Sequence, residues 1–325
     1  MLTKQGQGTL RWGDDMNAGL RTTIQEQGFP VEELRGRTAI LRMVPELGGR
    51  IIGLQSLKTG REWCWHQPRP DWLWANRAGD AFGDSPQAGI DECLPSVAAC
   101  RVRGRKIPDH GEVWHLRWSL DLEALAARKL RATMPLAISP FVFSRTIQVG
   151  DDGDFVFDYS LNNTGTEPEP FLWCLHPLLN LEPGDRLDLP AEVRSLRLNG
   201  GLGAPMNLGD RWDYPEPMPG VHLDRCEVPG MPGGCLKGFA GPLEQGRAAV
   251  VNDLSGDRFE LRWDASRIPF LGLWINRGHA GFHHVALEPS TGAPDSLAEA
   301  LEGWKQCRLL QPGETARWSL TIDIA

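Results

Sequence analysis

The sequence lacks the cysteine patterns that stabilise small secreted domains or hold metal clusters. Its seven cysteines are scattered, at positions 64, 93, 100, 174, 226, 235 and 307, and no two of them form a CxxC pair. An odd and dispersed set argues against a disulfide framework and against a zinc cluster. We therefore expect no metal site and no cofactor, and cysteines that act as small buried hydrophobic residues in a reducing compartment.

Basic charge and long apolar runs are also scarce. The chain has 34 Lys and Arg against 42 Asp and Glu, a net charge of -8, which disfavours nucleic acid and anionic membranes as partners. No apolar run is long enough to span a membrane, and the first eight residues lack the apolar core of a signal peptide. We expect a cytoplasmic protein, monomeric or homodimeric, that binds neither nucleic acid nor membrane.

Helical periodicity is rare, whereas strand patterns with Gly, Pro, Asn and Asp turns recur along the chain. Strands are predicted over residues 38–44, 50–57, 141–149, 155–161 and 316–324, with a hairpin connection at 150–154. Residues 296–303 are a short helix candidate with Asp295 or Ser296 as N-cap, and residues 15–27 are a weaker candidate. This pattern predicts an all-β fold, a large antiparallel β-sandwich with few short helices. We expect one domain over 1–325, with residues 1–37 as an N-terminal extension or strands.

Tryptophan is abundant where tyrosine is not, with thirteen Trp against two Tyr. An indole offers a flat apolar face and one hydrogen-bond donor, which suits the apolar face of a sugar ring. The same side chain is also a large core residue, so composition by itself only favours a carbohydrate ligand.

The most informative carboxylate is Glu288, which follows an apolar run over residues 282–287 and precedes Pro289. A carboxyl group held at the end of a buried strand is partly desolvated, and desolvation raises its pKa toward the range useful for a general base. The simpler interpretation is a Glu at an exposed strand end.

Two histidines occupy similar positions. His176 ends an apolar run and precedes Pro177, and His110 precedes Gly111, which lets the backbone pass close to a ligand. Trp114 and Trp118 are expected to alternate on a strand that follows His110. One titratable group at a strand end is unremarkable, but three that share this pattern indicate a catalytic constellation.

Further polar residues are candidate substrate contacts. Asn76 and Arg77 can bind sugar hydroxyls, and Asp91 and Glu92 point to opposite faces of an extended chain, so that one of them, here Glu92, can reach a ligand. Adjacent His283 and His284 diverge in the same way, which argues against one metal ion between them.

Several short motifs, taken in order, resemble the aldose 1-epimerase (galactose mutarotase) superfamily. The matching segments are residues 45–54, 76–77, 89–95, 109–111, 162–165, 176–181, 287–289 and 294–296. The resemblance covers about residues 38–325 and implies a β-supersandwich that interconverts α and β sugar anomers without a cofactor. It implies Glu288 as the base on the anomeric hydroxyl and protonated His176 as the acid on the ring oxygen. His110 would be a third catalytic residue, which hydrogen-bonds the substrate and helps to hold charge near the ring oxygen, and Arg77 would bind a sugar hydroxyl. Asn76, Glu92 and Trp114 are further expected substrate contacts.

Two departures from the family pattern concern the substrate. Leu178 and Leu179 stand where the family motif has Tyr-Phe, and Lys237 stands near the position of a family Asp that binds sugar hydroxyls. We hypothesise that Lys237, with Arg77, favours a sugar that carries an acidic group; a surface lysine is the alternative.

Other functions are compatible with the same residues. A carbohydrate-binding or regulatory protein could keep such a pocket without turnover, and a different sugar isomerisation or a lyase reaction could use the same fold. Retention of Glu288, His176 and His110 together favours the enzyme.

Overall fold

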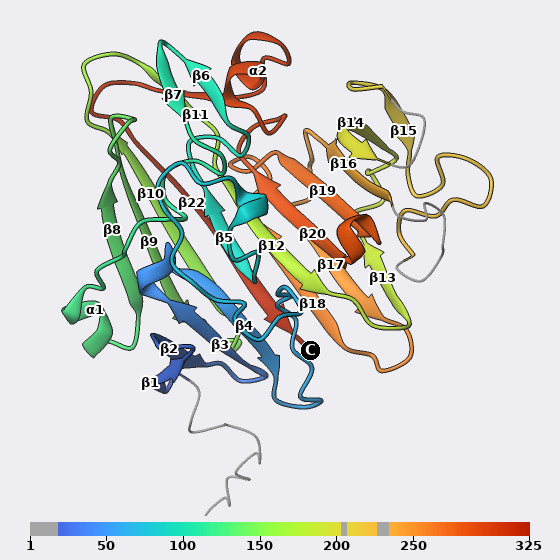
Figure 1. The fold of residues 1–325 in the computed structure, drawn as a ribbon, viewed down its shortest axis with the longest axis horizontal. Helices are drawn as coiled ribbons and strands as arrows, with labels where there is room; N and C mark the ends of the chain where they lie inside the picture. The colour runs from blue at the N-terminus through green and yellow to red at the C-terminus, as the bar shows by residue number, and fades with distance from the viewer. Residues whose placement is uncertain (1–18, 203–206, 226–233) are drawn as a thin grey trace, which may run out of the picture.

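Antiparallel strands dominate the computed structural model, which describes residues 19–202, 207–225 and 234–325 (Figure 1). The larger of its two main sheets has eleven strands. Hydrogen-bonded neighbours follow one another in the order β1 (Arg21–Glu26), β2 (Phe29–Arg35), β3 (Ala39–Val44), β4 (Arg50–Ser56), β5 (Ile90–Cys93), β12 (Cys174–Asn180), β20 (His283–Ser290), β19 (Phe270–Arg277), β16 (Gly234–Ala240), β14 (Ser195–Leu202) and β15 (Arg211–Asp213).

The second main sheet has seven strands. Their order is β13 (Asp185–Asp188), β17 (Arg247–Asn252), β18 (Arg258–Trp263), β22 (Thr315–Ile324), β10 (Phe155–Asn163), β9 (Phe141–Val149) and β8 (Leu130–Pro135). Two smaller sheets pair β6 (Cys100–Val102) with β7 (Arg105–Ile107) and β11 (Glu169–Phe171) with β21 (Arg308–Leu310). The predicted all-β sandwich is therefore confirmed.

Helices are short and peripheral. α1 (Leu122–Ala126) lies beside β8, and α2 (Leu297–Glu302) lies beside β6 at the other end of the molecule (Figure 1). The 3-10 turns are η1 (Pro45–Leu47), η2 (Phe82–Asp84) and η3 (His279–Gly281). The predicted helix at 296–303 is confirmed, with the Ser296 hydroxyl accepting from the Glu299 N–H. Within the described residues, no helix has the length and hydropathy to cross a membrane.

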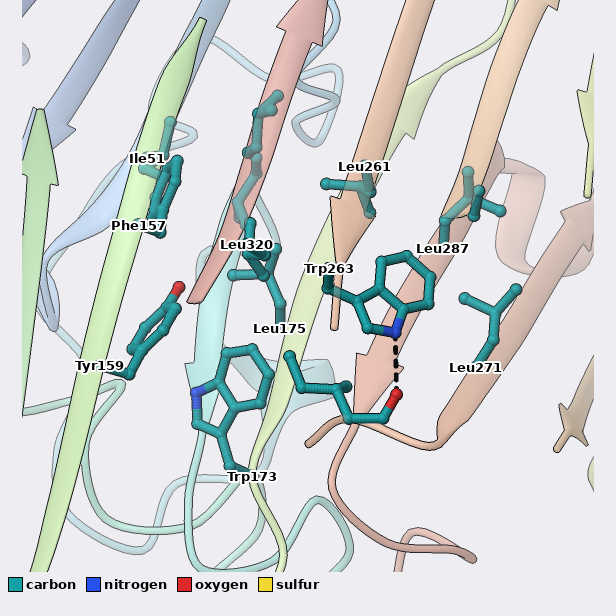
Figure 2. Packing of buried hydrophobic residues seen from close by; sticks show 14 of the residues in the cluster. Ile51, Phe157, Tyr159, Trp173, Leu175, Leu261, Trp263, Leu271, Leu287 and Leu320 are labelled. Atoms are coloured by element: carbon teal, nitrogen blue, oxygen red, sulfur yellow. Dashed lines mark hydrogen bonds between the residues drawn. The ribbon is translucent and has the colours of Figure 1, made fainter. Parts of the chain in front are cut away.

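The core lies between the two main sheets and is built from the inward side chains of alternating strands. Figure 2 shows Phe157, Leu261 and Leu320 of the smaller sheet beside Leu175 and Leu287 of the larger one. The indole N–H of Trp263 donates to the carbonyl oxygen of Ile268 at 2.8 Å (Figure 2). Because side chains alternate along a strand, the residues next to these core positions must face the opposite side of the sheet.

A buried carboxylate joins the two sheets. Glu92 of β5 is fully buried and accepts hydrogen bonds from Arg145 of β9 (3.1 Å), the Tyr159 hydroxyl of β10 (2.9 Å) and the Trp173 indole (2.7 Å). Arg145 also donates to the carbonyl oxygen of Gly49 at 2.6 Å. Sequence reasoning took Glu92 for a substrate contact. The structure instead places its carboxylate inside the sandwich, where it accepts from donors on β9, on β10 and on the segment between β11 and β12.

Three predictions about strand boundaries and secondary structure are wrong. β12 and β20 continue through Pro177 and Pro289, so His176 and Glu288 lie within strands and not past their ends. Residues 21–26 form strand β1 instead of a helix, and residues 15–18 of that prediction lie outside the described residues. Trp114 lies in a turn and Trp118 in an irregular segment, so the strand predicted after His110 is wrong.

We predict that Glu92→Gln lowers the free energy of unfolding by about 3–5 kcal/mol, because it leaves the buried Arg145 guanidinium without its counter-charge. Urea unfolding followed by tryptophan fluorescence measures the change. Glu244→Gln, at an exposed position, is the matched control and should stay within about 0.5 kcal/mol of the parent. A Glu92→Gln protein as stable as the control would show that this network does not hold the sheets together.

Candidate functional site

The candidate site lies on the face of the larger sheet that points away from the core. Leu287 faces the core, so Glu288 faces the other way, and the same alternation turns His176 outward beside the inward Leu175. In the register of β19 with β20, Glu288 lies opposite Gly272. A Cβ on Gly272 would lie 3.2 Å from the Cβ and from Oε2 of Glu288, so the missing side chain makes room for the carboxylate.

A cavity of about 630 Å³ opens on this face, a volume suited to a small-molecule ligand. Four of the residues predicted from the sequence line it together: Glu288, His176, His110 and Lys237. They come from the adjacent strands β12 and β20, from β16, which β19 separates from β20, and from the loop after β7. Other lining side chains are amides, aromatic rings and one further acid: Gln67, Gln87, Asn199, Asn276, Phe82, Trp274, Phe282 and Asp295.

Glu288 belongs to a buried charged cluster with Lys237 and Asp295. The Lys237 ammonium donates to Oε2 of Glu288 and lies 3.2 Å from Oδ1 of Asp295. The pKa of Glu288 is raised, mainly by burial. The charge of Lys237 lowers this pKa, and the charge of Asp295 raises it. Burial lowers the pKa of Lys237, but the negative charges of Asp295 and Glu288 raise it by more. The pKa of Lys237 is therefore raised overall. Lys237 is thus a buried ammonium held by two carboxylates, not a surface lysine.

His176 approaches Glu288 from the neighbouring strand. Its Nε2 lies 3.7 Å from Oε1 of Glu288. Burial lowers the pKa of His176 well below its ordinary value, and the nearby charges of His110 and Lys237 add to this effect. The ring is therefore neutral near pH 7 in the free protein. The protonated His176 that the family resemblance implies for the reaction stays a prediction.

His110 packs edge-to-face against His176, with the two ring centroids 5.0 Å apart. Its Nδ1 lies 3.0 Å from Oδ1 of Asp109. Within the part of the chain that the structure describes, Nε2 of His110, Nδ1 of His176 and Oε1 of Glu288 are buried and have no hydrogen-bond partner. Buried polar atoms are normally satisfied, so this grouping fits a ligand that offers several hydroxyl groups.

The remaining sequence-predicted contacts are not among the residues that line the cavity. Trp114 is buried and donates to the Asp109 carbonyl oxygen at 3.0 Å, so it supports the His110 loop from behind. Arg77 is exposed, and its backbone N–H donates to the Asp80 carboxylate. Asn76 is buried. Glu92, as described above, points into the core.

Several lining residues were not singled out from the sequence. His284 shares a strand face with Glu288, and burial together with His283 lowers the pKa of His284 to about 4. The Trp274 indole N–H donates to Nε2 of His284 at 3.1 Å. Residues four apart on one strand face the same side, so the spacing between His284 and Glu288 could have predicted that both line the cavity. Asp295 was taken for a helix cap, whereas its side chain accepts from Asn199 at 2.9 Å and contacts Lys237.

The cavity offers little to a metal ion. Among residues 19–202, 207–225 and 234–325, no group of three or more His, Cys, Asp or Glu side chains is arranged to hold one. The potential donor atoms of Glu288 and Asp295 instead contact the Lys237 ammonium.

Comparison with known proteins identifies the fold. No family model and no curated protein matches the chain. Among solved structures, a galactose mutarotase-like protein from Lactobacillus casei is 18% identical with a TM-score of 0.64, over 94% of this chain and 100% of that one. A galactose mutarotase-like protein from Clostridium acetobutylicum is 12% identical with a TM-score of 0.62, over 94% of this chain and 98% of that one. At such identities the likeness concerns the fold alone, and the chain has the galactose mutarotase-like fold.

Proposed function

We propose that this protein is an aldose 1-epimerase-like isomerase, which interconverts the α and β anomers of a monosaccharide or sugar derivative by acid–base ring opening. The observation that carries the proposal is the arrangement of Glu288 opposite two imidazoles in one cavity, with unpartnered Oε1, Nε2 and Nδ1 atoms among the described residues. The fold neighbours agree with this class of reaction.

The reaction needs one base and one acid. The Glu288 carboxylate takes the proton of the anomeric O1 hydroxyl as the C1–O5 bond breaks and a C1=O1 carbonyl forms. An imidazole gives its proton to O5, which receives the electron pair of the broken bond. Rotation about C1–C2 then presents the other face of the carbonyl. On ring closure the imidazole takes the proton back from the O5 hydroxyl, and Glu288 returns its proton to O1. A positioned acid or base contributes roughly 10²–10⁴-fold each.

The other lining residues suit a sugar without an acidic group. Gln67, Gln87 and Asn276 are neutral amides that can bind hydroxyls, and Trp274 presents an aromatic surface. Lys237 is the only Lys or Arg among the described lining residues, and two carboxylates already contact it. These contacts speak against the hypothesis, made from the sequence, that Lys237 and Arg77 select an acidic substrate.

We predict that Glu288→Gln lowers the rate of anomer exchange by about 10²–10⁴-fold, because the amide cannot accept the O1 proton. Polarimetry or NMR exchange on a panel of freshly dissolved sugars measures the rate. Glu302→Gln, on the exposed end of α2, is the control and should leave the rate unchanged. A loss below about tenfold, roughly 1.4 kcal/mol, would exclude Glu288 as the base. If the parent protein accelerates no sugar in the panel, the carbohydrate-binding alternative replaces the enzyme.

We predict opposite pH shifts from two changes beside Glu288. The base acts only when ionised, so activity is lost as the pH falls through the raised pKa of Glu288. Asp295→Asn removes a charge that raises this pKa, so the acidic limb of the pH–rate profile moves to lower pH. Lys237→Gln removes a charge that lowers it, so the limb moves to higher pH. Profiles of kcat over roughly pH 4–9 test this; two shifts of the same sign would contradict it.

A further inference from the structure

A second cavity lies on the outer face of the larger sheet, toward the edge formed by β14, β15 and β16 (Figure 1, upper right). It has a volume of about 300 Å³ and, among the described residues, shares no lining residue with the cavity of Glu288. Leu196 and Leu198 of β14 face the core, so Arg197 between them faces outward, as Glu288 does. The two cavities are therefore separate hollows on one face of the sheet.

The strand register shows how far the second cavity lies from Glu288. One row of register partners crosses five strands, from Arg211 of β15 through Arg197 of β14, Phe239 of β16 and Gly272 of β19 to Glu288 of β20. Neighbouring strands lie about 4.8 Å apart, so the backbones of Arg197 and Glu288 are about 14 Å apart. A Cβ on Gly272 would lie 3.2 Å from the Phe239 ring, which therefore separates the two cavities.

The Arg197 guanidinium stacks on an aromatic ring in the lining of the second cavity. Its Cζ lies 3.6 Å from the centroid of the Trp304 indole. Trp304 packs against Phe239, with ring centroids 6.1 Å apart, and belongs with Phe270 to one apolar cluster. A guanidinium held against an indole keeps its in-plane N–H groups available, and their fork matches the oxygens of a phosphoryl or carboxylate group. Arg197 is thus oriented for an anion before any anion binds.

Two arginines face each other in this lining without a carboxylate partner. Arg197 and Arg211 are directly opposite on one face of β14 and β15, and like charges at such positions destabilise a strand pair. Within the described part of the chain neither side chain is in an ion pair, and Arg211 makes one contact, from Nη1 to the Ser195 hydroxyl at 3.5 Å. An anion between the two guanidinium groups would remove this repulsion.

The charges that line the second cavity define the class of anion. Arg194, Arg197 and Arg211 stand against Glu192, which leaves an excess of two positive charges in a chain whose net charge is -8. The Glu192 carboxylate already accepts from the backbone N–H groups of residues 244 and 245, at 3.0 and 2.7 Å. A phosphoryl group carries about -1.5 to -2 charges at pH 7 and offers three acceptor oxygens. It matches the excess, whereas a carboxylate carries one charge.

We propose that the second cavity binds the phosphoryl group of a small phosphate ester. The planar fork of Arg197 binds phosphoryl oxygens, and Arg211 adds its charge from the opposite strand. Phe239 and Phe270 give the carbon skeleton of the ester an apolar wall, and the volume is at the lower end of the range for small-molecule ligands. This site is independent of the proposed anomer interconversion, and its occupancy is measured without turnover of any sugar.

The first experiment measures binding by the full chain with glycerol 3-phosphate, which has no hemiacetal and so cannot enter the proposed reaction. Isothermal titration calorimetry in a phosphate-free buffer of fixed ionic strength should give a Kd of about 1 mM or below. Inorganic phosphate should bind more weakly, because it has no carbon skeleton for the apolar wall. Equally tight binding of inorganic phosphate would contradict the ester and assign the cavity to the free ion. Binding of neither, or equally tight binding of acetate, would overturn the site.

The second experiment separates a built site from general attraction between charges. Arg197→Gln and Arg211→Gln should each weaken binding of glycerol 3-phosphate about tenfold or more. Arg197→Lys keeps the charge but loses the planar fork and the stack on Trp304, so it should weaken binding as well. Arg101→Gln, at an exposed position of β6, makes the same change in net charge and should bind like the parent. Parent affinity in Arg197→Lys, or one equal loss in all four variants, would contradict the proposal.

Stability without ligand distinguishes a binding role from a structural one. Because Arg211 faces Arg197, Arg211→Gln should unfold in phosphate-free buffer at the same temperature as the parent or at a higher one. Glycerol 3-phosphate should raise the unfolding temperature of the parent and of Arg101→Gln by more than that of Arg211→Gln. A lower unfolding temperature of unliganded Arg211→Gln would show that this arginine stabilises the fold, and the proposal would be wrong.

Discussion

The carboxylate of Glu92 in the middle of the sandwich is the constraint on which the site depends. A buried carboxylate is costly unless it is hydrogen-bonded and paired, and here Arg145, Tyr159 and Trp173 supply both. With Glu92 directed to the core, Asp91 must face outward, and the register sets Asp91 opposite His176 on β12. A slip of one residue would turn His176 into the core, so the inner polar network also determines the outer face.

The outer face concentrates charge in a manner that suits acid–base chemistry. Burial raises the pKa of Glu288, and Lys237 and Asp295 act on that pKa in opposite directions. In the proposed reaction this carboxylate is desolvated but available as a base, which is the usual requirement for proton transfer near neutral pH. A lysine in place of a sugar-binding acid need not change the reaction. In the proposed reaction the charge of Lys237 lowers the pKa of the Glu288 carboxylate.

Particular residues show how far sequence reasoning reaches. β9, β10 and β22 were predicted closely because their period-two alternation reflects one buried and one solvated face. β12 and β20 were cut short because Pro177 and Pro289 lack a backbone donor, which normally ends a ladder. Glu92 was predicted to contact a ligand, but its carboxylate accepts a hydrogen bond from Arg145 in the core. Arg145 is 53 residues away in the chain, so a local sequence pattern does not reveal this pairing.

The sequence by itself determined the class of fold, through its alternating apolar residues, and four of the chemical groups that share the cavity, through strand-end patterns and ordered motifs. Glu288, His176, His110 and Lys237 were all named from it. The tertiary structure decided the contacts and the surroundings of each group. Whether a histidine is neutral, whether a lysine is free, and which carboxylate supports which ring depend on burial and on contacts a few ångströms long. Those contacts join segments far apart in the chain, such as Lys237 with Glu288 and Asp295, and Phe82 with Asp109.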